Sequence, residues 1–176
     1  MDLHDFNNGK MYFEEDLSPE ASLLLEMAAS NYALNRTEPF LLKAYFLEPK
    51  SLTVIVALYR YYFYQHKHKD ALRAAHRAMS LAADQTELSV PWQELTIKIL
   101  GYSAMRSMAL VRFYLLALKG AGYLNLRMGE WEEGIRMLEK VSELDQEDRL
   151  GAKSLLDTVR NEWRENQQSV KEARTN

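Results

Sequence analysis

The histidines are the side chains of this chain best suited to chemistry, and two of them stand close together. His66 and His68 are separated by one residue, a spacing at which two imidazoles can hold one metal ion. The neighbouring sequence supplies no third ligand, and no His-Glu-x-x-His motif occurs. A solvated turn is therefore the preferred interpretation of this segment, and a metal site is the alternative.

A basic band continues from this turn, which we define as residues His66–Arg77. Its Lys69, Arg73 and Arg77 recur every four residues and so share one face of a helix. An ordinary solvated face is expected, and binding of RNA or another acidic partner is the alternative. The net charge of −3 and the pI of about 5.9 argue against a general nucleic-acid binder.

No pattern typical of an enzyme is present. Gly120-Ala121-Gly122 lies inside a predicted helix, so it is not a phosphate-binding loop. No carboxylate stands alone in an apolar stretch, where burial would raise its pKa and prepare it for acid–base catalysis. The absence of cysteine excludes disulfides, thiol catalysis and Cys-based zinc sites. We therefore expect a protein that is not an enzyme and has no catalytic residues, no metal and no cofactor.

The composition points to a protein outside the membrane. The residues Met1–Lys10 are polar and lack the apolar segment of a signal peptide. The charge-free apolar run Ser51–Tyr59 is much shorter than the ~20 residues that cross a bilayer. Apolar content is 47% and charged content 27%, the balance of a soluble domain. Together with the lack of cysteine, this favours the cytoplasm.

The elements that would position any site are all helices. Apolar residues recur with the helical period, and no stretch alternates between apolar and polar over the length of a strand. Ser18, Thr37 and Ser51 stand where helix caps are expected, and a break is expected near Gly101. We expect residues 1–17 to form a flexible N-terminal arm, in which Met11–Phe13 is disordered or docks on the domain, and residues 165–176 to form a frayed tail. We expect helices over residues 19–34, 37–48, 52–65, 70–83, 92–100, 104–128, 130–144 and 149–164.

A repeat becomes visible when segments 18–51 and 52–85 are superposed without gaps. Equivalent small or apolar residues then lie 34 positions apart, namely Leu24 and Leu58, Ala44 and Ala78, and Leu47 and Leu81. A third segment, 115–148, contains a turn and helix start that reads Gly-Glu-Trp-Glu-Glu-Gly-Ile over residues 129–135. These segments resemble the tetratricopeptide repeat (TPR), a helix–turn–helix unit of about 34 residues.

The resemblance implies an all-α, TPR-like helical solenoid of antiparallel helix pairs over residues 18–164. Its three repeats are 18–51, 52–85 and 115–148, with an insertion at 86–114 and a C-terminal capping helix at 149–164. The sequence departs from the family pattern at Tyr59, where glycine is preferred, and at Thr37, where alanine is preferred. A further resemblance, carried by Leu115–Arg127 alone, is to uncharacterised repeat proteins near bacterial nitrogen-fixation genes.

In this family the first helices of the repeats line a concave groove, and the matching positions here are aromatic, apolar and basic. The implied function is a protein–protein interaction module or adaptor that holds a peptide or helix of another protein. The alternatives are a small chaperone for a bacterial secretion client, and a metal- or RNA-binding module that uses the basic band. A homodimer through the insertion at 86–114 is a further alternative. The expected partner-binding residues are Val56, Arg60, Phe63, Tyr64, Lys119, Tyr123, Leu126 and Arg127.

Overall fold

The computed structural model describes residues 15–32 and 36–161 of the 176-residue chain. The described part contains helices and no strand, which confirms the all-α prediction for these residues. Residues 1–14 and the tail 165–176 lie outside the described residues, and so does the expected docking of Met11–Phe13. The helices are α1 (Pro19–Ser30), α2 (Glu38–Leu47), α3 (Leu52–Tyr64), α4 (His68–Thr86), the 3₁₀ turn η2 (Trp92–Glu94), α5 (Ile97–Arg127), α6 (Trp131–Leu144) and a helix over residues 152–161.

Short polar side chains set the helix starts, as predicted for two of three positions. The hydroxyl of Ser18 accepts a hydrogen bond from the Ala21 amide, and that of Ser51 accepts one from the Val54 amide, both at 3.2 Å. Thr37 does stand at the N-cap of α2, but its side chain makes no capping hydrogen bond. Its buried hydroxyl instead donates to the carbonyl of Ala28 at 3.1 Å, and so it ties α2 to α1.

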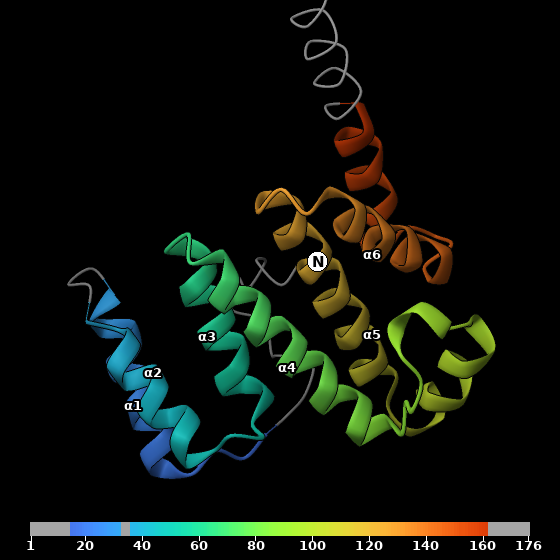
Figure 1. The fold of residues 1–176 in the computed structure, drawn as a ribbon. Coiled ribbons are helices and arrows are strands. Elements are labelled where there is room, and N and C mark those ends of the chain that lie inside the picture. The colour runs from blue at the N-terminus through green and yellow to red at the C-terminus, as the bar shows by residue number, and fades with distance from the viewer. Residues whose placement is uncertain (1–14, 33–35, 162–176) are drawn as a thin grey trace, which may run out of the picture.

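The helices form a row in which each packs mainly on its neighbours in the chain (Figure 1). The helices α1 and α2 lie at one end of the row, and α6 with residues 152–161 lies at the other. The most extensive contact joins α4 to α5, and α4 also packs on α3. One face of α4 consists of buried alanines, which let helix axes on both sides approach closely: Ala71, Ala75, Ala78 and Ala82.

The contact between α5 and α6 depends on two glycines. A Cβ atom at Gly134 would lie 2.7 Å from Leu126 Cγ and 2.8 Å from the Gly122 carbonyl oxygen. A Cβ atom at Gly122 would in turn lie 3.1 Å from the Gly134 carbonyl oxygen. The two backbones therefore approach closely at this crossing, and neither glycine position has room for a larger residue.

The insertion at 86–114 differs from the prediction in where its helices begin and break. Residues 92–94 form only the turn η2, and the helix that follows starts at Ile97 and passes through Gly101. The break lies at Ser107, whose backbone is extended (φ −157°, ψ 105°). The Ser107 hydroxyl accepts a hydrogen bond from the Leu110 amide at 3.2 Å and so caps the second part of α5.

Both ends of the described chain are held by carboxylates at helix starts. Glu15, in the arm predicted to be flexible, accepts hydrogen bonds from the Ser51 hydroxyl at 2.6 Å and the Leu52 amide at 2.9 Å. The last helix starts at residue 152, not 149, because Asp148 accepts from the Lys153 amide at 2.9 Å. Among the described residues, no helix combines the length and apolarity needed to cross a bilayer.

The glycine contact predicts opposite effects for two Gly→Ala substitutions. Gly134→Ala should lower the free energy of unfolding by about 1–2 kcal/mol, because overlap with Leu126 and Gly122 outweighs the better helix propensity of alanine. Gly101→Ala is the control, since a Cβ there meets nothing within 4 Å, and it should raise stability by about 0.5–1 kcal/mol. Urea unfolding followed by circular dichroism measures both. Equal effects at the two sites would contradict the close contact.

Candidate functional site

The aromatic run of α3 is divided between the core and the surface. Tyr59 is buried and stacks on Phe63, with ring centroids 6.1 Å apart. Tyr61 is also buried, whereas Tyr64 is 47% exposed at the end of the helix. Because α3 lies between α2 and α4, two of its faces are covered and the third is left for Arg60 and Tyr64.

Arg60 and Tyr64 border a hollow of about 660 Å³ between α1, α2 and α3, which we call the α1–α3 hollow. The hollow is lined by small residues, which leave its centre open, and by aromatic rings at its rim. Tyr32 at the end of α1 meets Tyr61 edge-to-face, with ring centroids 6.4 Å apart. The lining residues are Leu25, Ala28, Ala29, Tyr32, Thr37, Leu41, Ala57, Arg60, Tyr61 and Tyr64.

Arg60 is the one charged side chain among the residues that line the α1–α3 hollow. Burial raises the pKa of Tyr61, and it raises that of the neighbouring Tyr62 to about 12. Both phenols are therefore protonated at neutral pH and add no negative charge. The hollow thus offers apolar walls, phenol hydroxyls and one cation, a combination suited to an apolar side chain that is followed by a carboxylate.

A second group of predicted residues meets across α3 and α5, and we call it the α3–α5 aromatic cluster (Phe63, Tyr64, Tyr123 and Arg127). The Phe63 ring lies 5.6 Å from the Tyr64 ring and 6.0 Å from the Tyr123 ring, centroid to centroid. The Arg127 guanidinium donates to the Tyr123 hydroxyl at 3.1 Å. The structure therefore brings together residues that lie about sixty positions apart in sequence, and Tyr64 belongs to both the cluster and the α1–α3 hollow.

Three of the expected binding residues are buried within the protein. Val56 lies in the main core, and Leu126 is covered by the helix over residues 152–161. Lys119 is only 8% exposed, and its ammonium donates to the Leu150 carbonyl at 2.7 Å. Lys119 and Leu126 have structural roles because the turn and helix after α6 fold onto this face of α5, whereas Val56 belongs to the core that α3 shares with α4 and α5.

The expected partner-binding residues lie on α3 and α5, and none of them lies on α1. Leu25 and Tyr32 line the hollow from α1, but neither was among the expected partner-binding residues. They line a hollow because α1 is the first helix of the row and has a described neighbour on one side only. The periodicity of α1 reveals an apolar face, but it does not show whether another helix covers that face.

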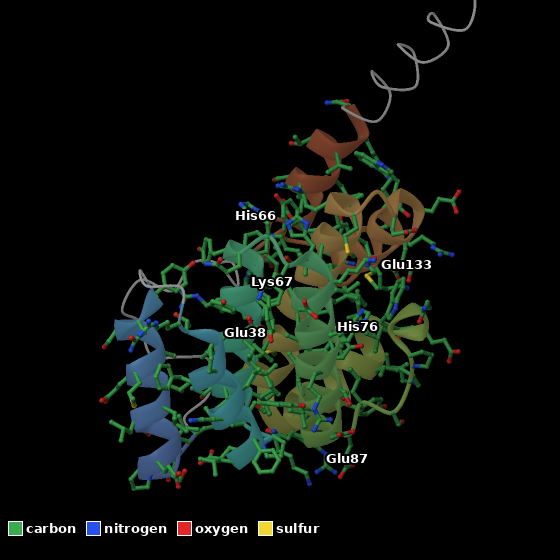
Figure 2. The ribbon with its side chains drawn as sticks, turned by 60° about the vertical axis from the view of Figure 1, so that its left-hand side comes forward. Glu38, His66, Lys67, His76, Glu87 and Glu133 are labelled. Atoms are coloured by element: carbon green, nitrogen blue, oxygen red, sulfur yellow. The ribbon has the colours of Figure 1, made fainter. Side chains whose placement is uncertain are left out.

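Charged side chains of the basic band form ion pairs with nearby residues. Lys67 pairs with Glu38 of α2, next to His66 (Figure 2), and Arg73 pairs with Asp70 at 2.8 Å. The pKa of His68 is lowered by burial and by the positive charge of Arg127. Within residues 15–32 and 36–161, no three metal-ligating His, Asp or Glu side chains gather.

The structural role of Lys119 leads to a test by substitution. Lys119→Met keeps the length of the side chain but leaves the buried Leu150 carbonyl without this donor, so the free energy of unfolding should fall by about 1–3 kcal/mol. Arg127→Met is the control on the same helix, where an exposed side chain is changed and stability should stay within about 0.5 kcal/mol. Urea unfolding measures both variants. A larger loss for Arg127→Met would contradict this assignment.

Comparison with known proteins gives one well-matched relative. No family model matches the chain, and no solved structure matches it. The relative is named "Uncharacterized 19.8 kDa protein in nifW 5'region" and comes from Azotobacter chroococcum mcd 1. It is 46% identical over 159 residues, which cover 90% of this chain and 89% of the relative. Identity at this level along nearly the whole of both chains shows that this chain belongs to the same protein family as that Azotobacter protein.

Proposed function

We propose that this protein is a TPR-like adaptor that holds a peptide or an amphipathic helix of another protein in the α1–α3 hollow. The single observation that carries the proposal is the hollow itself, with Arg60 and Tyr64 at its edge. Its volume of about 660 Å³ falls within the ~300–1,000 Å³ of typical binding pockets. Tyrosine and arginine are also the side chains that most often anchor protein partners.

The TPR-like part of the proposal is supported by how equivalent positions pack. Ala44 and Ala78, 34 residues apart, are 0% and 4% exposed, so each permits a close helix contact. Leu47 and Leu81 also share a register, but Leu47 is 42% exposed and Leu81 only 4%. The difference is expected if the pair of helices α1 and α2 is the first of a stack, because only its inner side is covered.

The chemistry of the hollow narrows the class of ligand. The side chains of Ala28, Ala29 and Ala57 are small and apolar, so they leave room in the hollow for apolar side chains of a ligand. The positive charge of Arg60 at the edge of the hollow favours a ligand that carries a carboxylate. The proposed ligand is therefore an apolar segment next to Asp or Glu, in a peptide or along one face of a helix. No acid–base pair lines the hollow, so the proposal includes binding and no catalysis.

Site-specific photocrosslinking in the native host tests this proposal. A photoreactive phenylalanine analogue at position 64 should form an adduct with a defined protein, whereas the same group at Glu132, exposed on α6, should not. Ala29→Arg, at an exposed position that lines the hollow, should abolish the adduct at position 64 by filling the space. Adducts that are equal at positions 64 and 132, or that persist in Ala29→Arg, would exclude the hollow as the binding site.

With the crosslinked partner in hand, two matched tyrosine substitutions quantify the anchor. Tyr64→Ala should weaken binding about tenfold, because it removes roughly 1–2 kcal/mol of aromatic contact. Tyr102→Ala removes a ring of similar exposure, 60% against 47%, at a distance from the hollow, and it should leave the affinity unchanged. Isothermal titration calorimetry measures both. Equal losses would show that binding occurs elsewhere.

A further inference from the structure

The described part of the chain starts beside α3, at a point that is fixed by Glu15. The Glu15 carboxylate accepts hydrogen bonds from the Ser51 hydroxyl at 2.6 Å and from the Thr53 amide at 3.0 Å. From this point the chain crosses to the start of α1, where the Ser18 amide donates to the Glu48 carboxylate at 2.7 Å. The 14 residues that precede Glu15 are therefore attached at the start of α3, not at the start of α1.

A partly exposed stripe of α3 runs from this point along the helix. Four of its side chains follow each other at intervals of four, three and four, so they share one face, which we call the α3 stripe: Thr53, Ala57, Arg60 and Tyr64. The first three are partly exposed, and Tyr64 is 47% exposed. Because the Thr53 amide binds Glu15, the α3 stripe begins where the preceding residues are attached.

The α3 stripe and its surroundings are apolar, aromatic and basic. The whole of α3 contains no Asp or Glu, and Arg60 places a positive charge within the stripe. In the adjoining α3–α5 aromatic cluster, the guanidinium of Arg127 lies 6.0 Å from the centroid of the Tyr123 ring. A surface of this kind favours an apolar segment that also carries carboxylates.

The sequence before α1 has the complementary composition. Residues 11–15 read Met-Tyr-Phe-Glu-Glu, an apolar run that is followed at once by two carboxylates. Residues 1–14 contain three acidic residues and a single lysine. The segment therefore matches the class of ligand proposed for the α1–α3 hollow, and it belongs to the same chain.

The length of this segment fits the α3 stripe. The helix α3 has 13 residues and is therefore about 20 Å long. Since an extended chain rises about 3.3 Å per residue, Tyr12 can reach about 10 Å from Glu15, three residues away. Arg60 follows Thr53 by seven residues, which is also about 10 Å along the helix. An extended segment that follows the stripe thus places Tyr12 level with Arg60.

We propose that residues 11–14 lie along the α3 stripe of their own molecule and compete there with the partner protein. A short tether gives the segment an effective concentration of about millimolar, so a contact too weak to form between separate molecules is populated within one. The segment then covers Arg60 and Tyr64, which also border the α1–α3 hollow, until a partner displaces it. The competition rests on the function proposed above, whereas the docking of the segment does not.

Paramagnetic relaxation in nuclear magnetic resonance spectra of the full chain tests the docking. Because the chain lacks cysteine, Lys10→Cys carries a single nitroxide label beside the proposed segment. The label should remove most of the amide signal of Ala57 and Arg60. The amides of Leu42 and Phe46, whose side chains are 47% and 86% exposed on α2, should keep most of their signal. A segment that does not dock would affect both helices equally.

Two controls separate docking within one molecule from other causes. The double substitution Tyr12→Ser with Phe13→Ser removes the aromatic rings and should restore the signals lost on α3, while circular dichroism checks the fold. Mixing nitroxide-labelled chains with separate isotope-labelled chains should cause no loss of signal. The docking is overturned if α2 and α3 lose signal equally, if the double variant keeps the loss, or if the loss occurs between separate chains.

The same double variant tests the competition. Tyr12→Ser with Phe13→Ser should increase the crosslink at position 64 and tighten partner binding several-fold, because the site is open in a larger fraction of chains. Unchanged partner binding in a variant that has lost the docking would overturn the competition. If neither protein forms an adduct at position 64, the proposed function is contradicted, and the relaxation measurement still decides the docking.

Discussion

The close packing of α4 against the helices on both sides is the constraint on which the row of helices depends. The buried alanines Ala71, Ala75 and Ala78 repeat at helical spacing and present no side chain longer than a methyl group. Because helix axes approach to ~8–10 Å only where contact residues allow it, these alanines set how closely α3 and α5 lie to α4. The glycine pair Gly122 and Gly134 does the same one step further along, between α5 and α6.

The same packing creates the α1–α3 hollow. The helix α3 is covered by α4 on one side, and its remaining surface turns toward α1 and α2. Since α1 and α2 form the end of the row, Tyr32 and Tyr64 keep a large exposed fraction although they belong to helices with buried faces. The hollow therefore follows from where the row ends, and its chemistry follows from the residues that α1 and α3 carry there.

Much of the fold was predictable because it depends on local rules. The helical period, the Ser18 and Ser51 caps and the turn at Gly129 are set within one or two helical turns, so sequence alone located the helices. The break in α5 was predicted near Gly101. A glycine inside a helix costs only about 1 kcal/mol relative to alanine, so the helix continues through Gly101. Ser107 breaks the helix instead, by capping the part that follows.

For the candidate site, sequence determined which residues carry aromatic, apolar and basic groups on one face of each helix. It placed Arg60, Phe63, Tyr64, Tyr123 and Arg127 there, and the structure brings these residues together in two adjoining groups. Tertiary structure alone decided that Lys119 is held by the Leu150 carbonyl and that Leu126 is covered by the last helix. The physical reason is that helical periodicity specifies the face on which a side chain lies, whereas burial depends on which distant segment packs against that face.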